Sequence, residues 1–370
     1  MPVLANHPNR FRGSAGALRG LVALGTGAAL LAALLGSPRP ATAQPGGAPP
    51  IPPGAPATPP GAEVQRYRVV NLGVLNGGSK PVVNASGQVA VTLTDGSAPI
   101  TSFFDGKRVQ SIGTLGGTFA FANALNDRGQ ITGGSSAAAA DGRPHAFLWS
   151  SGAGMRDLDM HPTAESYGTA LNAAGDVVGF ARLYRGAARA FRWTERTGRE
   201  DLGTLKDDLS SAVAINDSGV VSGVSWVGIE IPHAFVWTRD RGMEDIGTLG
   251  GDTASAIAVG ARGEVTGYSD LSTWPGPSHT FVWTRAGGLR DLGALDGNPS
   301  YPTAMSAQAQ VAGIIDFDDG HHRAFSWTAA SGMRDLGSFG GPSAGAQAVN
   351  GKGQVVGHAT DKQNGLRAFL

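Results

Sequence analysis

The 370-residue sequence contains no cysteine and has no net charge, since 29 basic side chains balance 29 acidic ones. Without cysteine the chain forms no disulfides and carries no lipid-modified cysteine, so stability must come from packing. Balanced charge gives no long-range positive field, which argues against nucleic-acid binding. Only 16% of the residues are charged and 41% are hydrophobic, so the chain is not a disordered polyelectrolyte and should fold.

Long apolar runs are equally scarce, because the one at residues 21–35 is too short to span hydrocarbon. A basic stretch at 10–19 precedes it and a small-residue end at 41–43 follows, which is the pattern of a secretory signal. We therefore predict a signal peptide over 1–43 and a secreted mature protein, extracellular or periplasmic, with no membrane span after cleavage. An uncleaved signal anchor remains the alternative.

Residues 44–61 contain eight prolines among Gly and Ala. This composition cannot bury a core and favours extended polyproline II. The segment is either a spacer that holds the following domain away from the envelope or an inert joint between signal and domain.

From residue 62 to 370 the chain repeats itself. The first landmark is a polar residue followed by Leu or Ile and usually Gly, at positions 40 to 46 residues apart. Its seven copies begin at Asn71, Ser111, Asp157, Asp201, Asp245, Asp291 and Asp335. A fixed period of about 44 residues is the signature of a repeat architecture.

Two further landmarks recur with the same period. An Asn followed three residues later by Gly occurs at Asn84, Asn126, Asn172, Asn216 and Asn350, whereas Gly260 and Ser306 take its place in two copies. The segment basic–small–Phe–x–Trp occurs at His145–Trp149, Arg189–Trp193, His233–Trp237, His279–Trp283 and Arg323–Trp327, and its last copy is Arg367–Leu370. We expect the repeated tryptophans to form the core.

Each unit contains four short strand signals, as in Ala212–Ile215, Val220–Val224, Ala234–Trp237 and Met243–Ile246. The turn Asn216–Gly219 between the first two suits positive φ. Four strands per 44 residues predict an all-β fold, a seven-bladed β-propeller of four-stranded repeats, in which repetition around an axis protects the sheet edges. The alanine-rich first strand of each unit should lie nearest the axis, where lateral room is small.

The two ends of the repeat region are incomplete in complementary ways. The last unit has three strand signals, and a lone fourth one, Tyr67–Gly73, precedes the first complete unit. We predict that this N-terminal strand pairs into the last blade and closes the ring, giving a monomer without open ends. A linear array would need polar capping repeats.

These landmarks resemble the HAF-repeat family of probable extracellular repeat proteins. His145-Ala146-Phe147 and His233-Ala234-Phe235 match its core, and Asp245–Gly251 and Ala214–Gly219 match its companion segments. The resemblance covers nearly all of 68–370 and implies secretion and an extracellular repeat domain. It implies no activity. Arg189, Arg323 and Arg367 depart from the family's His, which indicates a basic contact and not an invariant ligand.

The search for chemistry yields one cluster of metal-ligand types. Asp316, Asp318, His321 and His322 could hold a calcium or transition-metal ion, or could form a solvated hairpin tip. The His-Ala-Phe histidines occur once per blade, so they should lie too far apart to share a metal. The Gly341–Gly345 match to a nucleophile elbow lacks the expected strand-turn-helix context and reads as a turn between blades. We expect no cofactor.

The repeats differ most between their second and third strands. These variable segments are Ser135–Pro144, Arg182–Ala188, Ser225–Pro232, Ser269–Ser278, Ile315–His322 and Thr360–Leu366. In a propeller they share one face with the connections between blades, and loops on a rigid scaffold commonly carry recognition. Tyr184, Trp226, Trp274 and Phe317, with Asp316 and Asp318, are the predicted ligand contacts, unless these loops fold back over the sheets.

The sequence therefore predicts a secreted, non-catalytic repeat domain, not an enzyme, that binds an extracellular glycan or protein partner through variable loops on one face. Two alternatives remain open. One is a secreted hydrolase or lyase with its site at the propeller mouth, although the inner strands offer mainly Ala, Ser and Thr. The other is a structural envelope protein.

Overall fold

The computed structural model describes residues 71–72, 80–94, 98–138, 142–159, 165–182, 187–228, 230–272, 277–317 and 319–370. The predicted signal peptide, the proline-rich spacer and most of the predicted closing strand lie outside these residues. Within them the chain forms seven antiparallel sheets, which we number one to seven in chain order. Among the described residues, no helix is long and apolar enough to cross a membrane.

The first three sheets contain twelve strands. The first has β1 (Val82–Val83), β2 (Val89–Leu93), β3 (Ile100–Phe104) and β4 (Val109–Ser111). The second has β5 (Gly116–Leu125), β6 (Ile131–Ala137), β7 (Pro144–Ser150) and β8 (Gly154–Asp157). The third has β9 (Glu165–Leu171), β10 (Val177–Arg182), β11 (Ala188–Thr194) and β12 (Gly198–Asp201).

The remaining four sheets repeat this plan. The fourth has β13 (Ser210–Ile215), β14 (Val221–Gly228), β15 (Ile231–Thr238) and β16 (Gly242–Asp245). The fifth has β17 (Ala254–Val259), β18 (Val265–Asp270), β19 (Ser278–Thr284) and β20 (Gly288–Asp291). The sixth has β21 (Ser300–Met305), β22 (Val311–Asp316), β23 (His322–Thr328) and β24 (Gly332–Asp335). The seventh has β25 (Gly340–Val349), β26 (Val355–Asp361) and β27 (Leu366–Phe369).

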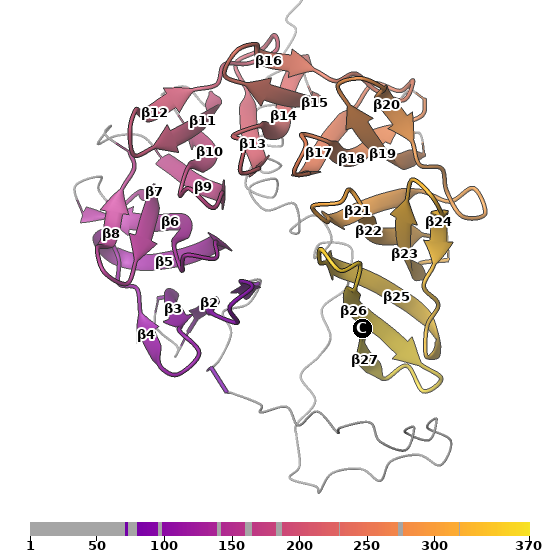
Figure 1. Ribbon diagram of the computed structural model, residues 1–370, viewed down its shortest axis with the longest axis horizontal. Coiled ribbons are helices and arrows are strands. Elements are labelled where there is room, and N and C mark those ends of the chain that lie inside the picture. The colour runs from indigo at the N-terminus through magenta and orange to yellow at the C-terminus, as the bar shows by residue number, and fades with distance from the viewer. Residues whose placement is uncertain are drawn as a thin grey trace, which may run out of the picture.

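The sheets stand around a central axis as the blades of a β-propeller (Figure 1). In every complete sheet the strands pair in chain order. The first strands β9, β13, β17, β21 and β25 lie nearest the centre, and the fourth strands lie at the outside. The predictions of seven repeated sheets and of an alanine-rich inner strand are therefore confirmed.

The core lies between neighbouring sheets and is formed by the repeated Phe and Trp of the third strands. Their phenylalanines are at most 2% exposed: Phe147, Phe191, Phe235, Phe281 and Phe325. Trp149, Trp193, Trp237 and Trp327 are also buried, and Trp283 is partly buried against the fifth-sheet core. Their prediction as core residues is confirmed. Burying such rings is the main favourable contribution to stability in a chain without disulfides.

The inner strands from β5 to β25 each contain a β-bulge, and side chains near three of these bulges bond to the next sheet. The register shifts between Ala212 and Ala214 of β13, and comparable shifts occur in the other inner strands from β5 to β25. Side chains near three of these shifts donate hydrogen bonds to a carbonyl of the next sheet: Asn123 to Gly168 (2.8 Å), Thr169 to Ala212 (2.8 Å) and Thr303 to Ala346 (2.9 Å). These bonds link successive blades around the axis.

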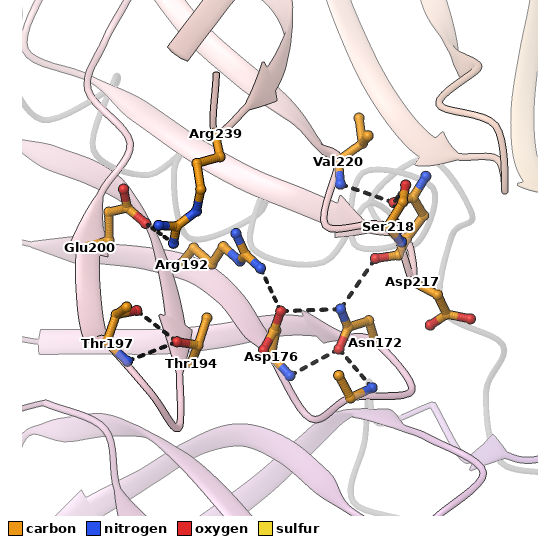
Figure 2. Close-up of polar contacts among 12 residues, drawn as sticks. Asn172, Asp176, Arg192, Thr194, Thr197, Glu200, Asp217, Ser218, Val220 and Arg239 are labelled. Atoms are coloured by element: carbon orange, nitrogen blue, oxygen red, sulfur yellow. Dashed lines mark hydrogen bonds and ion pairs between the residues drawn. The ribbon is translucent and has the colours of Figure 1, made fainter. Parts of the chain in front are cut away.

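The asparagines of the first turn form a second set of links, which we call the asparagine belt: Asn84, Asn126, Asn172 and Asn216. Each Oδ1 accepts hydrogen bonds from amides of its own turn, as Asn216 does from Ser218 (3.1 Å) and Val220 (2.9 Å). Each Nδ2 donates to the backbone oxygen at the equivalent position of the next sheet. Figure 2 shows the link from Asn172, beside the Asp176–Arg192 ion pair. The turn therefore serves both its own hairpin and the neighbouring blade.

The strands of the fourth sheet match the sequence prediction closely except at one end. The variable segment predicted over Ser225–Pro232 is mostly strand, because β14 runs to Gly228 and β15 begins at Ile231. The same segment contains Trp226, which packs inward and so lets the hairpin continue. The prediction of a loop across this whole range is wrong.

Candidate functional site

A cavity of about 420 Å³ lies between the sixth and seventh sheets. Its lining comes from the turn between β22 and β23, from β23 and β24, from the connection between β24 and β25, and from the beginning of β25: Phe317, Asp319, His321, His322, Arg323, Asp335, Gly337, Ser338, Gly341, Pro342 and Ala344. A variable segment and a connection between blades thus meet in one place. This agrees with the prediction that both lie on one face, which we call the loop face.

The turn that presents the aspartate and histidines is closed by backbone hydrogen bonds. The amide of Phe317 donates to the carbonyl of His321 (3.0 Å), and Gly320 donates to Phe317 (2.9 Å) with a φ of 78° that favours glycine. Phe317 packs its ring against the core cluster of the sixth sheet. The turn is therefore fixed to the blade by an aromatic anchor.

Charged groups of the turn form separate pairs. Nδ1 of His322 lies 3.1 Å from Oδ1 of Asp316, and Nδ1 of His321 lies 3.0 Å from Oδ2 of Asp319. The backbone amide of His321 also donates to Asp319, and this hydrogen bond is the first cause of the lowered pKa of that carboxyl. No group of three or more potential metal ligands gathers among the described residues. Asp318 lies outside them, so the predicted metal set as a whole stays untested.

Arg323 occupies the basic position of the repeat and extends into this cavity. In three other sheets that position is a histidine whose Nδ1 contacts the aspartate of the fourth strand: His145–Asp157 (2.8 Å), His233–Asp245 (2.7 Å) and His279–Asp291 (3.0 Å). Arg323 contacts Asp335 in the same way, at 3.2 Å, and its guanidinium lies 5.0 Å from the centre of the Phe317 ring. Its side chain remains 48% exposed, so it carries hydrogen-bond donors that a ligand can reach.

Asp335 also orders the connection that forms the far wall. Its Oδ1 accepts the amide of Gly337 at 2.7 Å, as Asp245 does from Gly247 at 2.8 Å. Ser338 Oγ then donates to the carbonyl of Gly341 at 2.7 Å. The repeated Asp-Leu-Gly landmark is thus a capping device for the connection between blades, and this is a structural role that the spacing alone did not reveal.

Trp226 does not stand free on the loop face. It is 9% exposed and packs with Phe180, Ala188 and Val224 between the third and fourth sheets. Its exposure was wrongly predicted, because a ring that breaks the repeat can still fill a gap between blades. Tyr184, Trp274 and Asp318 lie outside the described residues. Of the predicted contacts, Phe317 lines the cavity and Asp316 flanks it, paired with His322.

The sequence analysis missed two sets of aromatic rings on the first and second strands of neighbouring sheets. Tyr167 lies 6.0 Å from Phe121 and 5.1 Å from Phe180, measured between ring centres, and Tyr268 contacts Tyr301 edge-on at 5.3 Å. Gly134 makes room for this stack, since a Cβ there would come within 2.7 Å of Phe121. The expectation that the inner strands offer mainly Ala, Ser and Thr was therefore incomplete.

Tyr167 provides a prediction about alkaline stability. Burial, reinforced by Glu165, raises its pKa from 10.0 to about 12. Because the folded state holds the phenolic proton more tightly than the unfolded state, this contribution to stability is present below pH 10 and is lost as the pH rises through 12. A shift of this size corresponds to at most about 3 kcal/mol. Denaturant melts should show a smaller loss between pH 10 and 12 for Tyr167→Phe than for the parent chain, and equal losses would contradict the assignment.

The Gly341–Gly345 segment does not form a nucleophile elbow. Ser343 lies within β25, and both its amide and its carbonyl bond to the Thr360 hydroxyl of β26. A strand at this place has no helix to point the serine outward. However, the expectation of a turn between blades is wrong, because the whole segment lies within β25.

Comparison with family models and with curated proteins gives no match. Among solved structures the chain is similar to the β-propeller domain of the trilobed protease from Pyrococcus furiosus, which has an open velcro topology, at 9% identity and a TM-score of 0.51 over 79% of this chain and 94% of that one. It is also similar to TolB from Acinetobacter baumannii (12%, 0.43, over 70% and 62%) and to Pyrococcus horikoshii acylaminoacyl peptidase (12%, 0.48, over 79% and 50%).

The seven sheets and the likeness to the propeller of the trilobed protease establish the β-propeller fold. The chain spans 62% of TolB and half of the acylaminoacyl peptidase. The prediction that the chain is not an enzyme is contradicted, because the similar propeller of the trilobed protease is a domain of a protease. Small residues near the axis were the premise of that prediction. They are not a sufficient reason to exclude catalysis, since a propeller can serve an enzyme as one of its parts.

Proposed function

We propose that this propeller is a secreted recognition domain that binds an extracellular glycan or protein partner on its loop face, with the cavity between the sixth and seventh sheets as the contact centre. The observation that carries the proposal is the composition of that cavity. One wall comes from residues 317–322, in which the sixth unit differs from the other repeats, and the facing wall comes from the connection to the seventh sheet and the beginning of β25. Binding residues are commonly placed on such loops above a rigid scaffold.

The chemistry of the cavity suits a ligand rich in hydroxyl and amide groups. Asp319 and Asp335 offer carboxylate oxygens that accept hydrogen bonds, whereas Arg323 and the imidazoles offer donors. Phe317 adds a partly buried ring against which an apolar face can pack. Because these groups already pair with one another, the site is pre-ordered and loses little side-chain freedom on binding.

Secretion is supported by the sequence. The signal-like residues 1–43 and the likeness to the HAF-repeat family agree with a chain that works in the bacterial envelope or outside it. The proline-rich segment 44–61 would then give the domain reach from its point of export.

The experiment is a binding assay of the purified chain against a glycan array and isolated cell-wall material, with two variants. Asp319→Ala/Arg323→Ala removes two side chains of the cavity. Arg285→Ala is the matched control, since Arg285 is 42% exposed, pairs with Glu244 at 2.7 Å and lies over the Trp283 ring at 5.5 Å. It thus has the same kinds of contact as Arg323, but in the turn between the third and fourth strands.

We expect the cavity variant to bind its ligand about tenfold more weakly or worse. The control should bind like the parent chain. Equal binding by all three proteins, or an equal loss in both variants, would place recognition elsewhere and overturn the proposal. Circular dichroism of each protein verifies that the fold is retained.

A further inference from the structure

The seventh sheet is incomplete within the described part of the chain. The six preceding sheets each have four strands, whereas β25, β26 and β27 form a sheet of three. The outer edge of β27 therefore presents backbone groups without a strand partner among the described residues. Such an edge readily accepts another strand.

Side chains around this edge are exposed where their counterparts are buried. Leu336 is 40% exposed, although the equivalent Leu158, Leu202, Ile246 and Leu292 are 2 to 8% exposed. Val356 on β26 is 43% exposed, although the equivalent Thr132, Val178, Thr266 and Ala312 are fully buried. Both faces of the seventh sheet thus lack a cover that the other sheets have. In Figure 1 this sheet and the first sheet are the two ends of the arc.

We propose that the segment Tyr67–Gly73 docks on β27 as its antiparallel fourth strand. The order of residues in Val69-Val70-Asn71-Leu72-Gly73 follows that of the sixth-sheet strand Met333-Arg334-Asp335-Leu336-Gly337. Chain length agrees as well, because Leu72 precedes Val83 by 11 residues and Leu336 precedes Val349 by 13. Of this segment the structure describes only Asn71 and Leu72, which belong to no strand.

The other sheets set the register. In the sixth sheet Phe325 lies opposite Asp335 and Ser326 lies opposite Arg334, and the amide of Leu336 donates to the carbonyl of Ala324 at 2.9 Å. By equivalence, Phe369 faces Asn71, Leu370 faces Val70, and Leu72 donates to Ala368. Each of these pairs brings a strand-forming residue to the open edge.

This register covers the exposed side chains on both faces. Leu292 and Met333 pack in one core cluster of the sixth sheet. Leu336 is the equivalent of Leu292 one unit later and Val69 takes the place of Met333, so Val69 would pack against Leu336. Leu202 and Val178 pack in another cluster. Val356 is the equivalent of Val178 and Leu72 takes the place of Leu202, so Leu72 would pack against Val356. Leu72 then also faces the first sheet, and the strand joins the two ends of the ring.

The absence of cysteine permits a direct test by disulfide trapping in the full chain. Val70→Cys/Leu370→Cys places two thiols opposite each other in the proposed register. Val69→Cys/Leu370→Cys is the control, because successive side chains of a strand point to opposite faces. Both variants are oxidised mildly and resolved on non-reducing gels, with the linked peptides identified by mass.

We expect an intramolecular disulfide in the first variant and little in the control. The bond should also raise the melting temperature, and reductant should reverse the rise, because it closes a loop of about 300 residues in the unfolded chain. Equal linkage in both variants would reject the register. Linkage between two chains would show that a second copy fills the edge, and no linkage would show that the segment does not dock. Ligand binding on the loop face is not used in this test, so the proposed function stands or falls separately.

Discussion

Replacing Gly267 by alanine should lower the free energy of unfolding by about 3 kcal/mol or more, at the upper end of overpacking effects. This glycine lies in β18 beside the bulge of β17, where the carbonyl of Ser255 turns toward it. A Cβ on Gly267 would lie 1.9 Å from that carbonyl oxygen and 2.8 Å from Cζ of Phe281. Neither neighbour can retreat, because the first belongs to the backbone and the second is fully buried.

Gly152→Ala is the matched control. Gly152 lies in the turn between β7 and β8, and a Cβ there would have no neighbour within 4 Å. We expect its stability to equal that of the parent chain or to rise slightly, because alanine restricts the unfolded chain. Denaturant melts of the three proteins decide the matter. A loss for Gly267→Ala no larger than that for Gly152→Ala would show that the bulge relaxes around the added carbon.

The architecture could be predicted from sequence because it is repeated. A period near 44 residues, four strand signals per unit and alanine in the first strand follow from requirements that every blade shares. The sequence also has a glycine at the position equivalent to Gly267 in five other units: Gly133, Gly179, Gly223, Gly313 and Gly357. A recurring glycine can be recognised from the sequence alone. The close approach of the neighbouring carbonyl, which requires the glycine, could not be predicted, because a β-bulge is a property of strand pairing and leaves no composition signal of its own.

The candidate site was predictable only in part. Phe317 was singled out because it interrupts the repeat, and Asp316, His321 and His322 because their side chains are of metal-ligand types. The structure places three of the four on one cavity, with Asp316 beside it. The far wall, Ser338 to Pro342, belongs to the next unit and resembles an ordinary connection. Trp226 also interrupts the repeat but fills the space between two blades. A residue that departs from the repeat can be recognised from the sequence. Whether its side chain is exposed to solvent, like those at the cavity, or buried between blades, like Trp226, depends on the packing.

Removing the asparagine belt at one position should also destabilise the fold strongly. Asn216→Ala deletes the acceptor for the amides of Ser218 and Val220 and the donor to the carbonyl of Gly260, which lies 2.8 Å away in the next sheet. Asn216 is only 7% exposed, so water cannot replace these partners. We expect a loss of about 2–4 kcal/mol in denaturant melts, since each buried group left without a partner costs about 1–3 kcal/mol.

The control variant Asn350→Ala distinguishes the contribution of the hydrogen bonds within the turn from that of the hydrogen bond to the next blade. Asn350 accepts the amides of Lys352 (2.9 Å) and Gln354 (3.0 Å) just as Asn216 does in its own turn. It is exposed, however, and its Nδ2 donates to Gln354 of the same turn at 2.8 Å. Its removal should cost about 1 kcal/mol, the net value of exposed turn hydrogen bonds. If both variants lose the same stability, the belt acts only within each hairpin, and the blades are held together by their aromatic core alone.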